Sequence, residues 1–118
     1  MIKQASNRGD ISLETVCQIL DNHKAHNVSV IDLSTKTTFA DYMIVASGTS
    51  QRHLSSLGDH LMKHLKQPGQ SHMEGRGNSD WILVDLGNVV VHLFRPEIRQ
   101  MYDLEGMWNM PALVSHTC

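Results

Sequence analysis

The chain has few of the residues that mark specialised classes of protein. Its 118 residues include two Trp, two Tyr, two Phe, three Pro and two Cys. Two cysteines are too few for a disulfide framework, and Cys17 and Cys118 lack the spacing of a metal-binding pair. No apolar run is long enough to span a bilayer, and the first ten residues lack the apolar core of a signal peptide. These absences predict a cytoplasmic protein with reduced thiols and no membrane contact.

An excess of basic residues is also missing. Asp and Glu number 12 against 10 Lys and Arg, which gives a net charge of −2. A general nucleic-acid binder needs a basic stripe to neutralise phosphates, so direct, sequence-specific nucleic-acid binding is not expected. The acidic excess lies in residues 67–118, with six acidic side chains and three basic ones. This half of the chain suits a basic protein partner better than a polyanion.

What the sequence does contain is an orderly series of helix and strand patterns. Ser12 is a suitable N-cap for an amphipathic helix that ends near 26–27. A second helix opens after Gly48-Thr49-Ser50 and ends at Pro68-Gly69. Strands are predicted at 28–33, 42–47, 71–74, 81–86 and 89–94, and a last helix runs from Pro96 to about Tyr102. This order predicts an α/β fold, a single-layer mixed β-sheet covered by helices.

The strands at 81–86 and 89–94 are joined by Gly87-Asn88, which predicts a β-hairpin. Because side chains alternate along a strand, its two faces can be read from the sequence. One face is wholly aliphatic and must be covered by helices: Ile82, Val84, Leu86, Val89, Val91 and Leu93. The other face mixes aromatic, acidic and imidazole groups and does not resemble a core: Trp81, Leu83, Asp85, Val90, His92 and Phe94.

Two interpretations of the mixed face remain open from the residues themselves. In the first, the C-terminal segment simply covers this face, and His92 is satisfied by Asp85, its diagonal neighbour, or by a tyrosine hydroxyl. In the second, the face is a binding patch, since aromatic anchors with a few polar groups form the centres of protein interfaces.

Catalytic and metal-binding patterns are incomplete. Gly48-Thr49-Ser50 is similar to the phosphate loop of a nucleotidyltransferase, but such an enzyme also needs two carboxylates on one strand face for Mg²⁺, and only Asp85 is there. His60 and His64 stand four residues apart on a predicted helix, with His53 flanking them, yet no acidic or cysteine ligand completes a site. Solvated helix-face histidines are the favoured interpretation, and no catalytic residue, metal or cofactor is expected.

Several short motifs together resemble the ribosomal silencing factor family, also called iojap-like proteins. The similarity covers roughly residues 11–109, which we take as the domain, with a flexible N-terminus at 1–10 and a C-terminal tail at 110–118. Asn88 stands where the family usually has aspartate, and Gly58 where alanine is common. The matching motifs are Asp41-Tyr42, Gly48-Thr49-Ser50, Arg52-His53, Glu74-Gly75, Asp80-Trp81, Asp85-Leu86-Gly87, Val90-Val91-His92, Arg99, Tyr102, Leu104-Glu105 and Trp108.

The resemblance implies a nucleotidyltransferase-like fold without the catalytic carboxylates, and a protein that is not an enzyme. Family members bind the large ribosomal subunit through its ribosomal protein fourteen and sterically block association with the small subunit. They thereby damp translation under nutrient limitation or in stationary phase. They are homodimers when free.

Joined to the residue patterns, the resemblance predicts a docking surface on the mixed face of the hairpin. Its residues are Trp81, Leu83, Asp85, His92 and Tyr102. Two other functions remain as alternatives. One is a divergent nucleotidyltransferase that uses Asp85 and a second acid, and the other is a homodimeric adaptor that does not bind ribosomes.

Overall fold

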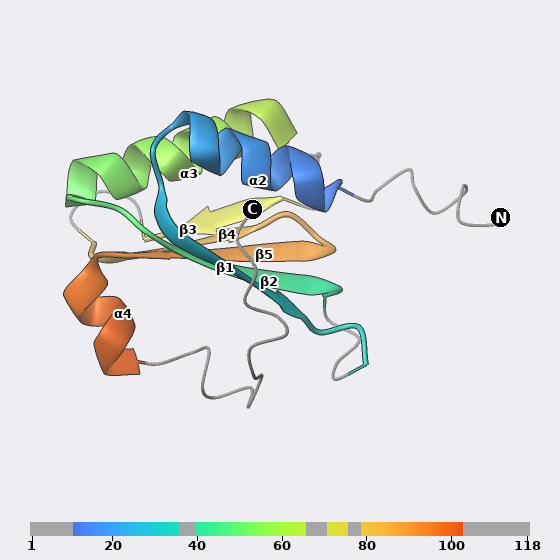
Figure 1. Ribbon diagram of the computed structural model, residues 1–118. Coiled ribbons are helices and arrows are strands. Elements are labelled where there is room, and N and C mark those ends of the chain that lie inside the picture. Colours follow the sequence, from blue (N-terminus) through green and yellow to red (C-terminus); the bar gives the residue numbers. More distant parts are fainter. Residues whose placement is uncertain (1–10, 36–39, 66–70, 76–78, 103–118) are drawn as a thin grey trace, which may run out of the picture.

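The computed structural model describes residues 11–35, 40–65, 71–75 and 79–102. Helices α2 and α3 lie together on one face of a five-stranded sheet, and the short helix α4 lies on the other side at one end (Figure 1). None of the described helices is both long and apolar enough to cross a membrane. In chain order the elements are α2 (Leu13–Asn22), β1 (His26–Asp32), β2 (Tyr42–Ser47), α3 (Gln51–Leu65), β3 (His72–Glu74), β4 (Trp81–Asp85), β5 (Val89–Phe94) and α4 (Pro96–Tyr102).

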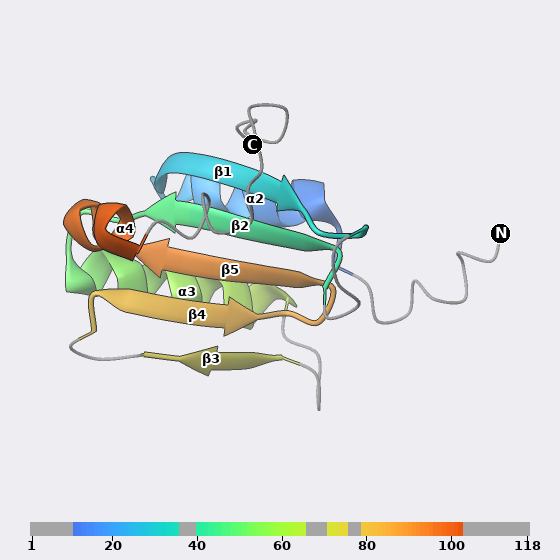
Figure 2. The same cartoon turned by 90° about the horizontal axis from the view of Figure 1, so that it is seen from below.

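The sheet has the order β1-β2-β5-β4-β3, so β5 occupies its centre (Figure 2). Strands β2 and β5 pair in parallel, whereas the other neighbours are antiparallel. This arrangement confirms the predicted mixed sheet and the predicted order of helices and strands. A parallel pair needs a long crossover between its strands, and here the crossover contains α3, β3 and β4.

The boundary between α2 and β1 differs from the prediction. Ser12 caps the helix as expected, its hydroxyl oxygen accepting from the Thr15 amide at 3.4 Å. The helix ends at Asn22, however, because Lys24 has a φ of 67°, which a helix cannot contain. Strand β1 therefore begins earlier, at His26, and includes an irregularity at Asn27, whose φ is 48°.

The aliphatic face of the hairpin is confirmed as core. All six of its predicted side chains are completely buried against α2 and α3. The helices contribute Val16 and Leu20 from α2 and a leucine stripe from α3. Cys17 lies half-buried beside them. The stripe on α3 comprises Leu54, Leu57 and Leu61.

Two departures from the family pattern have local explanations. The Asn88 side-chain amide donates to the Ile11 carbonyl at 2.9 Å, and its Oδ1 accepts from the Ile11 amide at 2.7 Å. An aspartate could accept but could not donate, so asparagine is the residue that ties the start of α2 to the hairpin turn. At Gly58 a Cβ would lie 2.6 Å from the Met73 Cε, so glycine leaves room for the Met73 side chain against α3.

Candidate binding face of the sheet

The hairpin has the predicted register. Asp85 pairs with Val90, Leu83 with His92, and Trp81 with Phe94. Gly87 in the turn has a φ of 98°, the left-handed conformation that glycine adopts without strain. These pairs place the mixed residues on the side of the sheet opposite α2 and α3, where Trp81, Leu83, Asp85 and His92 are half-buried.

Trp81 and His92 form the polar centre of this face. The indole Nε1–H of Trp81 donates to Nδ1 of His92 at 3.1 Å, with ring centroids 5.9 Å apart. Since an indole can only donate, Nδ1 carries no proton, and the neutral ring holds its proton on Nε2. Burial lowers the pKa of His92 to about 4, so the ring is uncharged at neutral pH. His92 is therefore an acceptor that fixes the orientation of Trp81.

The partner of Nδ1 on His92 differs from the one named in the first interpretation. There Asp85 or a tyrosine hydroxyl satisfies the imidazole, whereas in the structure the Trp81 indole donates to Nδ1. The Asp85 carboxylate instead accepts from the Gly87 amide at 2.9 Å, where it stabilises the hairpin turn. Alternation along the strands places Trp81 and His92 on one face but does not say which side chains bond to each other there.

Part of the mixed face is core after all. Phe94 is fully buried and belongs to a second apolar cluster, with Trp81 packed on it at a centroid distance of 4.8 Å and a tilt of 33°. Val90 and Ile98 also pack against this cluster. The expectation that the whole face is unlike a core is therefore wrong for Phe94 and its neighbours. The other buried members of the cluster are Ile31, Leu33, Ala40, Met43 and Val45.

Strand β3 extends the mixed face with two residues that the sequence did not place there. His72 pairs with Asp85 and Glu74 with Leu83, so both point to the same side as their partners. Their side chains are exposed and in contact, with Nε2 of His72 2.8 Å from a Glu74 carboxylate oxygen. A strand of three residues has too little alternation to reveal its register. The sequence therefore does not show that Glu74 lies next to Leu83 on the mixed face.

Arginine side chains attach α4 beside this face. The Arg99 guanidinium donates to the Asn27 carbonyl at 2.6 Å and to the hydroxyls of Ser47 and Ser29, thereby joining α4 to β1 and β2. Arg95, just before α4, contacts Asp80 at 3.2 Å. Tyr102 is the last residue of α4, and its side chain lies outside the described part of the structure, as do residues 103–109 of the predicted domain. The role of Tyr102 stays a prediction.

No metal centre is found among the described residues, where no group of three or more His, Cys, Asp or Glu side chains could hold an ion. The predicted loop residues Gly48-Thr49-Ser50 do precede α3, as in a phosphate loop. Among the described strand residues of the mixed face, the carboxylates are Asp85 and Glu74, which lie on neighbouring strands. The arrangement presents an aromatic centre with an acidic border, which is chemistry for recognition.

Comparison with known proteins identifies the family. Residues 5–116 match the family described as "Ribosomal silencing factor during starvation". The chain belongs to this family. The expectation drawn from the motifs of the sequence is thus confirmed.

Individual relatives agree with this membership. "Ribosomal silencing factor RsfS" from Zymomonas mobilis is 38% identical over 108 residues, a match that covers 90% of this chain and 81% of that protein. The mouse protein called "Mitochondrial assembly of ribosomal large subunit protein 1" is 34% identical, over 83% of this chain and 45% of its own length. A crystal structure of a Chromobacterium violaceum protein superposes with a TM-score of 0.75 at 31% identity, covering 86% of this chain and 92% of that chain. Neither named relative is named as an enzyme.

Proposed function

We propose that this protein is a translational repressor that binds the large ribosomal subunit and sterically blocks association with the small subunit, damping translation under nutrient limitation or in stationary phase. Membership of a family named for ribosomal silencing supports this function. The mouse relative, named for assembly of a large ribosomal subunit, supports the choice of subunit. Blocking requires affinity and placement only, so the mechanism needs no catalytic group, cofactor or metal. The repressor acts in the cytoplasm.

The docking surface in this proposal is the mixed face, with Trp81, Leu83, Asp85, His92 and Tyr102 in contact with ribosomal protein fourteen of the large subunit. The observation that carries the assignment is the hydrogen-bonded pair of Trp81 and His92, which presents a half-buried aromatic anchor in a fixed orientation. Anchors of this kind dominate the affinity of protein interfaces. The carboxylates of Asp85 and Glu74 border the anchor and complement a basic protein surface.

Steric blocking can be tested by sedimentation. The purified protein is run on a sucrose gradient with large subunits, before and after small subunits are added. We expect co-migration with the large subunit and loss of the joined particle. A protein that stays at the top of the gradient contradicts the proposed function, and a measurement of Mg²⁺-dependent nucleotide binding then tests the enzyme alternative.

The surface itself can be tested with Trp81→Glu. We expect the affinity for large subunits to fall more than tenfold, because truncating an aromatic anchor commonly costs about 2 kcal/mol or more. Gln18→Glu is the matched control, since it adds the same charge at an exposed position on α2, across the sheet. Both variants should keep the circular dichroism of the wild type. Wild-type affinity in a folded Trp81→Glu protein would place docking elsewhere.

The free protein is expected to be a homodimer. Sedimentation equilibrium of the wild type and Trp81→Glu measures whether self-association uses the same face. If Trp81→Glu is monomeric but still binds ribosomes, the mixed face is a dimer interface and docking uses another surface. A wild-type dimer that does not bind ribosomes supports the adaptor alternative.

A further inference from the structure

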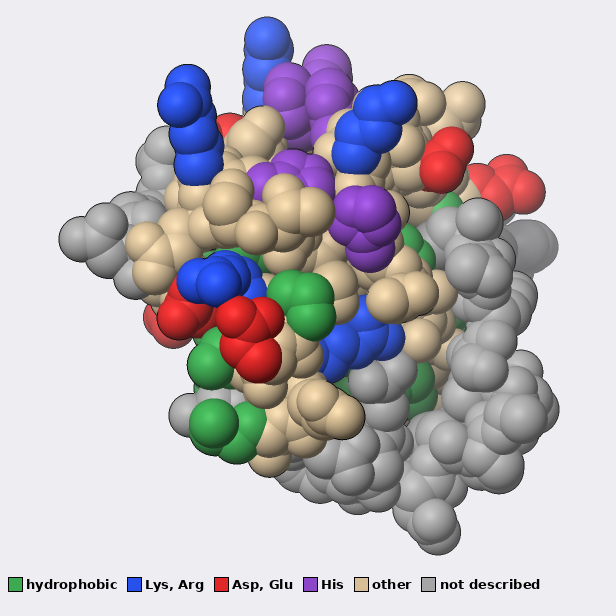
Figure 3. All heavy atoms as spheres, turned by 60° about the vertical axis from the view of Figure 1, so that its left-hand side comes forward, with side chains coloured by type: hydrophobic (Ala, Val, Ile, Leu, Met, Phe, Trp, Pro, Cys, Tyr) green, Lys and Arg blue, Asp and Glu red, His purple; other side chains and the backbone are tan. Residues whose placement is uncertain are grey.

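Five of the eight histidines gather where α2, β1 and α3 meet. Figure 3 shows imidazoles close together on this side of the helix layer, with lysine and arginine side chains around them. Each ring of the group lies near another ring of the group. The five are His23 at the C-cap of α2, His26 at the start of β1, and His53, His60 and His64 on α3.

Three of these rings form a stack between the two helices. His23 and His60 lie face to face, with centroids 3.5 Å apart and planes inclined by 11°. His64 continues the stack beyond His60 at 6.2 Å and 9°. The end of α2 thus rests on α3 through a ring-to-ring contact.

A second imidazole fixes the same end of α2. Nδ1 of His53 accepts from the Thr49 amide at 2.9 Å, so the neutral ring carries its proton on Nε2. That Nε2–H then donates to the His23 carbonyl at 2.9 Å. A second imidazole thus ties the end of α2 to the start of α3, beside the stack.

Charges around the stack oppose proton uptake. Desolvation lowers the pKa of His23, and positive charge on His60 or His64 lowers it further. On β1, the His26 ring faces His53 edge-on, with centroids 6.4 Å apart. In the described core cluster, the buried sheet side chains beneath α2 and α3 are aliphatic, so they bring no charge to the stack. The charged side chains at neighbouring positions are Asp21 on α2, Lys24 in the turn that follows it, and Asp59 and Lys63 on α3.

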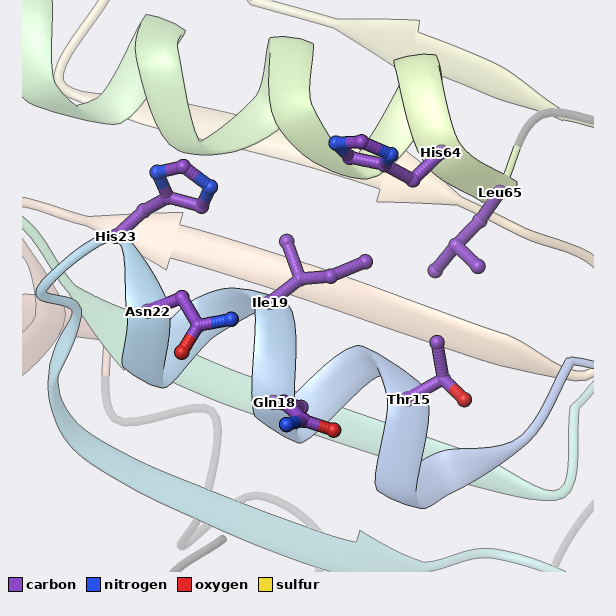
Figure 4. A pocket seen from close by; sticks show the side chains of 7 residues that line it. All are labelled: Thr15, Gln18, Ile19, Asn22, His23, His64 and Leu65. Carbon is purple, nitrogen blue, oxygen red and sulfur yellow. The ribbon is translucent and has the colours of Figure 1, made fainter.

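Water reaches the stack from one side. A pocket of about 300 Å³ opens between α2 and α3, with His23 and His64 at its wall and Ile19 in its floor (Figure 4). Protons can therefore exchange with these rings while the helices remain packed. The lining residues are Thr15, Gln18, Ile19, Asn22, His23, His64 and Leu65.

We propose that the stack of His23, His60 and His64 is a pH-sensitive clasp, which holds the end of α2 on α3 while its rings are neutral and releases it when they take up protons. Because the pKa of His23 is lowered on folding, the stabilisation is complete above the unfolded value of 6.5 and is lost as pH falls below it. Two charged rings at the stacking distance would repel each other and push the end of α2 away from α3.

Hydrogen exchange at the end of α2 tests the clasp. The informative amides are those of His23 and Ala25, which donate to the carbonyls of Ile19 and Leu20. After correction for intrinsic exchange, we expect their opening equilibrium to rise between about pH 7.5 and about pH 5.5, because the folded form favours the neutral His23 ring.

Two variants of His60 separate charge from packing. His60→Phe keeps a ring but cannot take up a proton, so the increase in exchange at low pH should become smaller by the part that comes from repulsion between His23 and His60. His60→Lys carries a permanent charge and should open the end of α2 at neutral pH. His72→Lys, on exposed β3, is the control for adding a charge.

The proposal is overturned if His60→Phe opens with the wild-type pH dependence, or if His60→Lys opens α2 no more than His72→Lys does. Should either His60 variant fail to fold, NMR titration of the wild-type rings decides. Mutually lowered, coupled titration of His23 and His60 supports the clasp, and independent titration at ordinary values rejects it.

Discussion

The two faces of the sheet are built from the same strands but differ in how they are covered. Beneath α2 and α3, the hairpin side chains are aliphatic and completely buried. On the opposite face a buried apolar cluster at β1, β2 and β5 gives way to half-buried and exposed polar groups along β4 and β3. The helix-covered face is wholly core, whereas the mixed face combines core packing with the polar groups that we propose for docking.

The difference shows what alternation along a strand can reveal. A face covered by neighbouring amphipathic helices is uniformly apolar, so its composition alone identifies it as part of the core. The mixed face contains a core residue such as Phe94 next to the polar pair of Trp81 and His92. Its composition therefore does not separate packing from binding, and three comparisons of variants can sharpen the contrast.

The largest effect should come from the helix-covered face. Leu93→Ala removes a completely buried side chain and should lower the free energy of unfolding by about 3 kcal/mol, the usual cost of a cavity in a core. Leu83→Ala, the same change on the mixed face, should cost only about 1 kcal/mol because Leu83 is half-buried. Urea unfolding of both variants measures the difference. Equal losses would mean that the two faces contribute alike to stability.

A smaller, pH-dependent effect is expected at His92. Its folded pKa of about 4 lies below the unfolded 6.5, so its contribution is complete above pH 6.5 and is lost as pH falls toward 4. The loss is on the order of 2–3 kcal/mol. His92→Gln retains an acceptor for the Trp81 indole but does not titrate, so its stability should fall less. His23 contributes equally to the wild type and to His92→Gln. If the two proteins have the same urea midpoint at each pH in this range, the buried His92 imidazole does not cause the pH dependence of stability.

The smallest effect concerns the attachment of the helix layer. Asn88→Asp leaves the Ile11 carbonyl without its donor and should cost about 1 kcal/mol in urea unfolding. Gln18→Glu makes the same chemical change at an exposed site on α2 and should be nearly neutral. If Asn88→Asp is equally neutral, the paired hydrogen bonds do not hold the start of α2.

Much of the fold could be predicted because its signals are local. The leucine spacing of α3 and the Gly87-Asn88 turn determine elements within one segment, and both predictions are confirmed. The end of α2 was predicted too late, because a left-handed residue such as Lys24 has no marker in the sequence. The parallel pairing of β2 with β5 depends on strands far apart in the chain, and only the layer type was predicted.

The candidate site was predicted less completely than the fold. Alternation correctly placed Trp81, Leu83, Asp85 and His92 on one face. It could not choose the hydrogen-bond partner of His92, since that depends on the indole orientation set by packing on Phe94. It also gave no register for β3, so the contribution of Glu74 was missed.

The position of β5 has a consequence for synthesis of the chain. This strand is at the centre of the sheet but is the last of the five to emerge from a ribosome. Until residue 94 has been made, β2 lacks its inner neighbour and β4 has an open edge, and both strands expose apolar surface. The nascent domain therefore cannot complete its sheet gradually. It depends on one late strand to join its two halves, and a ribosome that stalls before that strand releases a chain prone to aggregate.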